Sequence, residues 1–223
     1  MSDDTRTRSV LIPAAGVMLA GDLTLPETPA GLVIFAHGSG SSRHSIRNRQ
    51  VAGALNAGGL GTLLMDLLTP DEEAVDAVTT HLRFDIPFLA ERLLAACDWL
   101  AAETGTADLG TGLFGASTGG GAALVAAARR PERIRAVVSR GGRPDLAAAA
   151  LPCVRAPTLL IVGGEDAPVL DLNREAMAHM TAPVHLEVVP GATHLFSEPG
   201  ALAHVAGLAR DWFRRHLVAT ALA

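Results

Sequence analysis

The stretch "GLFGASTGGGAALVAAARRPE", residues 112–132, places one serine between an apolar run and an alanine-rich run. Within it, residues 115–119 have the pattern G-x-S-x-G, which forms a sharp turn when a strand precedes it and a helix follows. The apolar run favours a strand and the alanines favour a helix. Small residues two positions either side of the serine let the backbone segments approach closely. We predict Ser117 on a strand-to-helix turn that lifts its hydroxyl clear of a sheet. Taken alone, the pentapeptide fits equally well a tightly packed or anion-binding helix start.

The rest of the chain supplies the context for this turn. Short runs rich in Val, Ile and Leu alternate with alanine-rich stretches, as in parallel strands joined by helical crossovers. We predict an α/β fold with a mostly parallel central sheet and helices on both faces, as one domain over residues 1–223. The expected strands are 8–12, 17–25, 32–38, 61–67, 110–116, 134–140, 157–164 and 184–189, and the expected helices are 46–57, 85–103, 118–129, 168–180 and 200–217. The first two strands flank Ala15-Gly16, which predicts an antiparallel hairpin at the N-terminal edge.

The connections leave no room for a large lid. Only 16 residues separate Arg140 from Pro157, and they hold at most one short helix. The segment 68–84 is the only sizeable extra loop, and its Leu82 and Phe84 could fold over Ser117 as a small flap.

Composition narrows the classes of partner. The 223 residues carry a net charge of −5 with a pI near 5.9, which gives no basic footprint for nucleic acid. No apolar run is long enough to span a bilayer, so we expect no membrane partner. The N-terminus "MSDDTRTRSV" lacks the apolar core of a secretory signal, so we expect a cytoplasmic protein whose Cys97 and Cys153 stay reduced.

A serine hydroxyl is a weak nucleophile, so it needs a histidine base and an acid that orients the imidazole. His194, in "VVPGATHLFSEPG", lies in a loop between the last strand and the last helix, and we select it as the base. Asp166, in "LLIVGGEDAPV", follows a strand end and is the acid candidate. An isolated aspartate there is more often a helix cap, but the order Ser117, Asp166, His194 favours the catalytic interpretation. The weaker acid candidates are Glu165, Asp145 and Asp66.

Two backbone amides would stabilise the oxyanion. The first belongs to Thr118, directly after the nucleophile, and the second to the loop "HGSGSSR" that follows the strand 32–38, where we select Ser39. Taken alone, the HGSG segment fits a simple tight turn that leaves a buried strand.

At this point the chain resembles the α/β-hydrolase superfamily, because "AHGSG", "GASTGG", "GGEDAPV" and "GATHLF" occur in order along nearly the full length. Within it, "PGATHLFSEPGAL" and the short run after Arg140 are similar to the small, lidless dienelactone-hydrolase-like group. The resemblance implies action on esters, lactones and related acyl compounds. Dienelactone hydrolases proper use a cysteine nucleophile, whereas this chain has Ser117, which puts dienelactone itself in doubt as the substrate.

Arginines cluster near the expected site. Arg43, Arg47 and Arg49 follow the oxyanion loop, and Arg140 ends a strand on the same rim. Arginine forks suit carboxylate or phosphate, so we select Arg43 and Arg140 as substrate-binding candidates for an anionic substrate. The competing interpretation is that they pair with nearby acids or remain solvated. Metal-ligand spacings and a dinucleotide fingerprint are missing from the sequence, so we predict no metal and no cofactor.

The leading hypothesis is a serine hydrolase of small acyl esters or lactones that works through an acyl-enzyme at Ser117. A binding protein that uses the pocket without turnover is one alternative. An acyltransferase is the other, since it shares the acyl-enzyme and differs only in the acceptor. The sequence says nothing about the oligomeric state.

Overall fold

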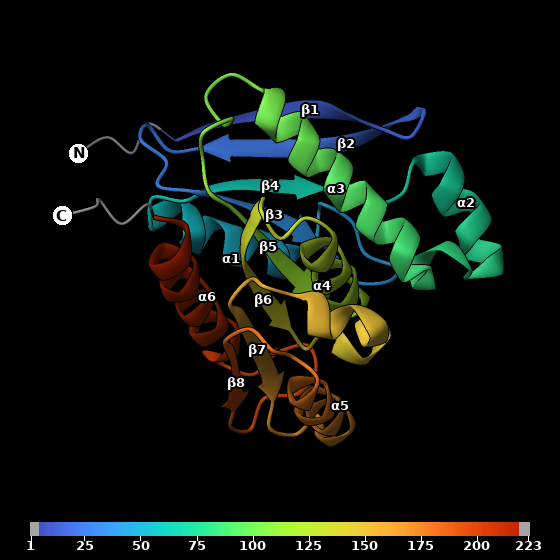
Figure 1. Ribbon diagram of the computed structural model, residues 1–223, viewed down its shortest axis with the longest axis vertical. Coiled ribbons are helices and arrows are strands. Elements are labelled where there is room, and N and C mark those ends of the chain that lie inside the picture. The colour runs from blue at the N-terminus through green and yellow to red at the C-terminus, as the bar shows by residue number, and fades with distance from the viewer. Residues whose placement is uncertain (1–4, 219–223) are drawn as a thin grey trace.

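The computed structural model describes residues 5–218. Its centre is an eight-stranded sheet of order β1-β2-β4-β3-β5-β6-β7-β8 (Figure 1). Strands β3 to β8 run parallel to one another, while β2 is antiparallel to both of its neighbours, β1 and β4. The strands are β1 (Arg6–Ala14), β2 (Val17–Leu25), β3 (Leu32–Ala36), β4 (Gly61–Met65), β5 (Thr111–Ala116), β6 (Ile134–Arg140), β7 (Thr158–Gly163) and β8 (Val184–Val189). The predicted fold class and the antiparallel N-terminal edge are confirmed.

The hairpin turn has the expected chemistry. Ala15 and Gly16, at the two central positions between β1 and β2, both have positive φ, at 47° and 87°. A two-residue turn with positive φ at both positions matches the twist of the strands it joins. It sets the register in which Ala14 pairs with Val17 and Arg6 pairs with Leu25.

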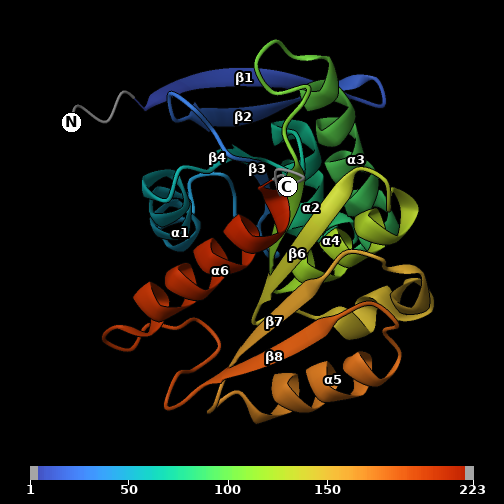
Figure 2. The same cartoon turned by 60° about the vertical axis from the view of Figure 1, so that its left-hand side comes forward.

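Helices cover both faces of the sheet, as Figure 2 shows from the side. Helices α3 and α4 pack on one face and α1 and α6 on the other. The helical segments are α1 (Ile46–Ala57), α2 (Pro70–Thr79), η1 (Leu82–Phe84), α3 (Ile86–Ala102), α4 (Thr118–Arg129), η2 (Pro144–Cys153), α5 (Ala167–Ala178) and α6 (Ala201–Leu217). The central strands β3 and β4 are buried at every position, which accounts for their continuous apolar runs.

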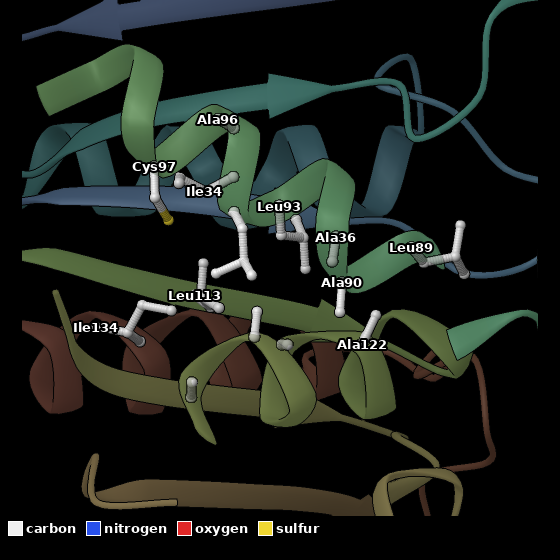
Figure 3. Close-up of a cluster of buried hydrophobic side chains, with 14 of the residues drawn as sticks. Ile34, Ala36, Leu89, Ala90, Leu93, Ala96, Cys97, Leu113, Ala122 and Ile134 are labelled. Carbon is white, nitrogen blue, oxygen red and sulfur yellow. The ribbon is translucent and has the colours of Figure 1, made fainter. Parts of the chain in front are cut away.

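Helix α3 illustrates how the core forms. Leu89, Leu93 and Cys97 recur at helical spacing along one stripe and pack against Leu113 of β5 and Ala122 of α4 (Figure 3). Burial raises the pKa of the Cys97 thiol to about 12, so this sulfur is an inert part of the core. Both cysteines are free, with Cys153 exposed.

The segment 68–84 differs from the loop that the sequence led us to expect. It contains α2, whose first turn has a capping box in which the Thr69 hydroxyl accepts from the Glu72 amide and the Glu72 carboxylate accepts from the Thr69 amide. Leu82 packs on the core and Phe84 is 55% exposed, and neither lines the cavity that contains Ser117. The segment is a helix beside the site, and Leu82 and Phe84, which could have formed a small flap, do not lie over the serine.

The run between β6 and β7 holds only the short helix η2, as predicted from its length. It bends at Ala148, whose φ is 20°. The carboxyl ends of β3, β5, β6 and β7 therefore open onto loops with no inserted domain among the described residues.

Candidate active site

Ser117 stands between β5 and α4 in a strained backbone conformation, with φ 51° and ψ −122°. Its carbonyl accepts hydrogen bonds from the amides of Gly120 and Arg143, which hold the turn. A Cβ on Gly119 would lie 2.2 Å from the Ala36 carbonyl oxygen, and one on Gly115 would lie 2.4 Å from the Gly119 oxygen. Only glycine fits at either position. The backbone strain at Ser117 persists because the surrounding structure enforces it, and such strain is typical of functional sites.

His194 and Asp166 come from two different loops and meet beside this turn. Asp166 follows β7 and His194 follows β8, and the distance from His194 Nδ1 to Asp166 Oδ2 is 2.6 Å. The His194 ring also lies against Gly141, where a Cβ would come within 3.4 Å of the ring. With Nδ1 engaged by the carboxylate, Nε2 is the ring nitrogen left for proton transfer. Ser117 and His194 line one cavity of about 260 Å³.

The other acid candidates are engaged elsewhere or exposed. Asp145 accepts two hydrogen bonds from Arg143, at 2.8 and 2.7 Å. Asp66 pairs with Arg43. Glu165 is exposed beside Asp166, and its backbone amide donates a hydrogen bond to the Ala192 carbonyl oxygen at 3.0 Å. Of the four candidates, only Asp166 contacts His194.

The loop after β3 lies directly on the serine turn. A Cβ on Gly38 would come within 3.1 Å of the Ser117 Cβ, so the Ser39 amide follows a residue in contact with the nucleophile candidate. The amide of Thr118, on the other side, belongs to the first residue of α4 and lies at the positive end of that helix. The structure thus places both predicted oxyanion amides next to Ser117.

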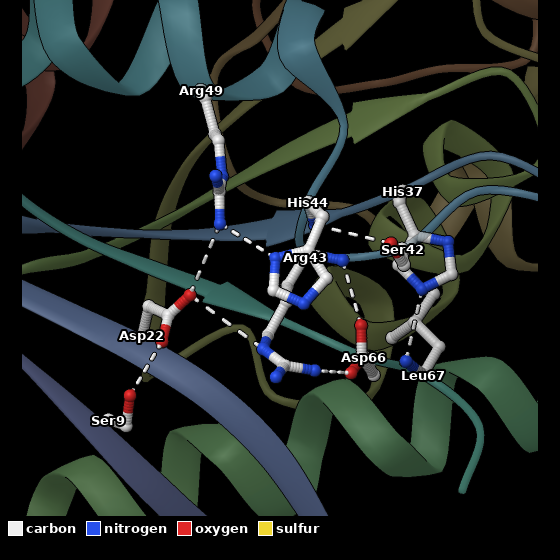
Figure 4. A network of polar contacts seen from close by, with 9 residues as sticks. All are labelled: Ser9, Asp22, His37, Ser42, Arg43, His44, Arg49, Asp66 and Leu67. Atoms are coloured by element: carbon white, nitrogen blue, oxygen red, sulfur yellow. Dashed lines mark hydrogen bonds and ion pairs between the residues drawn. The ribbon is translucent and has the colours of Figure 1, made fainter. Parts of the chain in front are cut away.

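His37 fastens this loop to the end of β4. Its Nε2 accepts a hydrogen bond from the Leu67 amide at 3.1 Å, and its Nδ1 lies 3.0 Å from the Gly38 carbonyl oxygen (Figure 4). The amide must be the donor at Nε2, so the proton of the neutral ring is on Nδ1. Burial lowers the pKa of His37, against smaller opposing effects of the Gly38 hydrogen bond and the Asp66 charge.

Arg43 fastens the far side of the same loop and is not placed as we expected. Its amide donates to Asp66 Oδ1 at 2.8 Å, its guanidinium pairs with Asp66 Oδ2, and its Nε lies 3.7 Å from Asp22 (Figure 4). Two carboxylates already neutralise this guanidinium, and Arg43 does not line the cavity with Ser117. The prediction that Arg43 binds substrate is therefore corrected to a role in holding the loop.

Arg140 does lie in the cavity with Ser117 and His194, as the prediction required. The residue is only 7% exposed, and neither Nε nor Nη1 has a hydrogen-bond partner. Arg47 lines the same cavity, and its buried Nε also lacks a partner. Arg47 is one of the arginines that follow the oxyanion loop in the sequence, but it is not among the predicted substrate-binding residues. Its position could have pointed to the site, because it lies in the first turn of the predicted helix 46–57, directly after the oxyanion loop.

A second cavity of about 520 Å³ adjoins the first along the loop 38–45. It shares Gly38, Ser39, Ser41 and Ser45 with the smaller cavity and reaches Thr118. Its apolar lining comes from Leu67, Leu68 and Leu89, and its polar lining includes Glu73, Asp76 and Arg83. The oxyanion loop therefore lines both cavities, which adjoin each other along it.

The helices of the described residues 5–218 include none long and apolar enough to cross a membrane. In the same range, no three His, Cys, Asp or Glu side chains gather in a group that could hold a metal ion.

Comparison with known proteins finds close relatives and chains of the same fold. A crystal structure titled as a dienelactone hydrolase from Anabaena variabilis is 56% identical, covers 96% of this chain and 99% of its own, and superposes with a TM-score of 0.94. Est1E from Butyrivibrio proteoclasticus, solved with ferulic acid, shares the fold at a TM-score of 0.78 and 18% identity, over 93% of this chain and 98% of its own.

Two curated relatives from strains of Mycobacterium tuberculosis, each named "Putative phosphoribosyl transferase", are 59% identical over 212 residues. The match covers 95% of this chain and 47% of each relative, so the chain spans about half their length. Residues 31–217 match the sequence profile of the Dienelactone hydrolase family, which covers the nucleophile turn, both loops of the His194–Asp166 pair and the oxyanion loop. The chain belongs to the Dienelactone hydrolase family and has the α/β-hydrolase fold.

Proposed function

We propose that the chain is a serine hydrolase that cleaves small acyl esters or lactones through an acyl-enzyme at Ser117. The observation that carries the proposal is the 2.6 Å contact of His194 with Asp166 beside a strained serine that lines the same cavity as the histidine. A nucleophile, a base and an orienting acid are the parts that acyl transfer requires.

In the first half of the reaction, Ser117 Oγ attacks the acyl carbon while its proton passes to His194 Nε2. The Asp166 carboxylate accepts a hydrogen bond from Nδ1–H, which orients the ring and stabilises the imidazolium. The oxyanion accepts hydrogen bonds from the Thr118 and Ser39 amides. The bond from carbon to the leaving oxygen then breaks, and that oxygen takes the proton from Nε2.

In the second half, water replaces the leaving alcohol. It gives one proton to His194 Nε2 while its oxygen attacks the acyl carbon. The second tetrahedral intermediate collapses, the carboxylic acid leaves, and the proton on Nε2 returns to Ser117 Oγ. In a lactone, the leaving oxygen stays attached to the acyl chain, so the product is a hydroxy acid.

The relatives support this proposal unequally. The ester chemistry of the family and of the esterase neighbours agrees with it. The transferase name of the mycobacterial relatives is not carried over, because this chain spans only about half of them. In this chain, Ser117 on its strand-to-helix turn and the His194–Asp166 pair are suited to acyl chemistry.

The test combines labelling with turnover. A fluorophosphonate should attach to Ser117, and the purified protein should hydrolyse members of a panel of p-nitrophenyl esters and lactones. Ser117→Ala should abolish labelling and lower kcat/KM by roughly 10⁴-fold to 10⁶-fold while the protein stays folded. Unlabelled Ser117 together with no turnover would favour the ligand-binding alternative.

The acyltransferase alternative needs its own readout. With an ester substrate and a graded series of alcohol acceptors, the ratio of new ester to free acid reports which acceptor resolves the acyl-enzyme. Hydrolysis predicts free acid as the main product at low millimolar alcohol. A dominant new ester under those conditions would assign the chain as a transferase.

A further inference from the structure

Arg140 is an unusual arginine, because it is buried beside the nucleophile and no acid compensates its charge. It is 7% exposed, and its guanidinium lies 5.9 Å from the centre of the Phe196 ring. Among the described residues, no carboxylate lies within 4 Å of its charged nitrogens, and neither Nε nor Nη1 has a hydrogen-bond partner. Buried donors without partners are costly, so an arrangement of this kind points to a ligand that supplies the acceptors.

Arg47 brings a second uncompensated cation to the same cavity. Its Nε is buried without a partner, and it forms no ion pair among residues 5–218. Neither Asp166, which contacts His194, nor Glu198, whose Oε1 accepts a hydrogen bond from Thr193, lines this cavity. Burial and the nearby Arg47 charge lower the pKa of Arg140 to about 10, so it remains a cation at neutral pH.

The first turn of α1 adds to this positive field. Ser45 caps the helix and Arg47 and Asn48 follow, and all three line the cavity. No acidic residue occurs in that turn, so nothing offsets the positive end of this twelve-residue helix. Two guanidiniums and a helix N-terminus therefore surround a space of about 260 Å³ that also contains Ser117 and His194.

The position of His194 indicates which half of a substrate enters this space. In the proposed reaction, Nε2 must protonate the leaving oxygen, so the leaving group passes next to the imidazole. The cavity with His194 is the one with both arginines. The larger cavity, which adjoins it along the oxyanion loop, carries the leucine lining that suits an acyl chain.

We propose that the Arg140–Arg47 cavity binds a doubly charged phosphate monoester on the alcohol part of the substrate, so that the chain cleaves acyl esters of small phosphorylated alcohols. This proposal rests on the proposed function for its turnover. Arg140 and Arg47, which form no ion pair among the described residues, match a dianion in charge. The three terminal oxygens of a phosphate also offer more acceptors to the two guanidinium groups than one carboxylate does.

The test uses three acetate esters of closely similar length, whose alcohols are 3-hydroxypropyl phosphate, 4-hydroxybutanoate and propane-1,3-diol. We expect kcat/KM to be highest for the phosphate ester, lower for the carboxylate ester and lowest for the hydroxyl ester. The value for the phosphate ester should exceed that for the hydroxyl ester about tenfold to hundredfold. Arg140→Met and Arg47→Met should each lower the phosphate-to-hydroxyl ratio at least tenfold. Arg140→Lys keeps the positive charge but loses the paired donors of the guanidinium, so it should retain part of the preference for the phosphate ester.

Arg214→Met serves as the matched control, because this exposed arginine is at the far end of α6 and its loss removes the same net charge. It should leave the ratio unchanged. An equal fall in Arg214→Met would show that only overall charge steers the substrate. A wild-type preference for carboxylate over phosphate, or no preference, would overturn the proposal.

Binding of inorganic phosphate separates this proposal from the proposed function. Calorimetry should detect binding to the wild-type protein that weakens at least tenfold in Arg47→Met, which tests the cavity even if buried Arg140 cannot be replaced without unfolding. If the hydroxyl ester is not cleaved and Ser117 is not labelled, the proposed function fails. If the hydroxyl ester is cleaved but phosphate neither binds nor favours turnover, only the anion cavity is refuted.

Discussion

Asp166 and Asp145 show that one side-chain contact distinguishes the candidate catalytic acid from an aspartate in a similar sequence position. Both follow strand ends, and from the sequence both could orient His194. In the structure Asp166 contacts His194 Nδ1 at 2.6 Å, while Asp145 is held by Arg143. The difference comes from which loops the sheet brings together, and it leads to a prediction.

Asp166→Asn should lower ester turnover by roughly 10³-fold to 10⁴-fold, because the amide no longer favours the Nδ1–H tautomer or stabilises the imidazolium. Asp145→Asn is the matched control, with the same change after a neighbouring strand, and should alter kcat/KM by less than about threefold. The measurement is kcat/KM of each variant on one activated ester. A larger loss in Asp145→Asn would mean that the acid follows β6 instead of β7.

His37 gives a second prediction at this scale, through pH. Its folded-state pKa is lowered by burial, so below the ordinary value near 6.5 the unfolded chain binds more protons than the folded one. Stability should therefore fall as pH falls from 6.5 toward 5.0, by at most about 2 kcal/mol from this residue.

His37→Gln removes the titration while keeping an acceptor for the Leu67 amide. Urea unfolding at pH 7.5 and pH 5.0 should show a smaller pH dependence in the variant than in the wild-type protein. An equal slope in both proteins would show that other groups account for any acid sensitivity.

At the scale of elements, the nucleophile turn depends on the absence of side chains. Gly119→Ala should cost about 3 kcal/mol or more and reduce soluble yield, because its Cβ would lie 2.2 Å from the rigid Ala36 carbonyl. Gly207→Ala is the matched control in the interior of α6, where a Cβ meets nothing within 4 Å. It should stabilise the protein by about 0.5–1 kcal/mol through helix propensity. The free energies of unfolding in urea give the comparison, and a destabilising Gly207→Ala would contradict it.

The element scale also shows where sequence reasoning reached its limit. The parallel strands, the hairpin and five of the helices follow from periodicity and turn residues, and the structure confirms them. Helix α2 was missed although Thr69-Pro70-Asp71-Glu72 is a readable capping box, because its short, polar run lacks an apolar stripe. The pairing of Arg43 with Asp66 could not be predicted, since it depends on β4 lying beside β3 in the sheet.

For the whole molecule, the sheet order explains why distant residues share one site. The strands β3, β5, β6 and β7 are neighbours and parallel, so their carboxyl ends and the loops that follow bring Ser39, Ser117, Arg140 and Asp166 to the same edge. The chain order of motifs predicted which residues belong together. It did not predict that the oxyanion loop lines two adjoining cavities, because the course of that loop depends on its packing against Ser117 and the neighbouring strand ends.

The two cavities limit the size of the acyl group. The larger one has about 520 Å³ and only three leucines among its lining residues, with serines, histidines and charged side chains making up most of the rest. Helix α2 stands beside it but turns Val75 and Val78 to solvent, at 57% and 86% exposure, so it offers no apolar cover. An acyl chain that outgrows the leucine lining extends into water, where each unburied methylene forgoes about 0.8 kcal/mol.

We therefore expect kcat/KM on p-nitrophenyl esters to peak at roughly two to four acyl carbons and to fall with each further carbon pair. Activity should show no jump when a long-chain ester passes its critical micelle concentration, because residues 5–218 form no apolar lid that a lipid surface could displace. Val78→Ser serves as the control: since this side chain faces solvent, the chain-length profile should not move. If the profile peaks at eight carbons or more, or shifts toward short chains in Val78→Ser, then α2 folds over the leucines when substrate binds and acts as the cover that the free protein lacks.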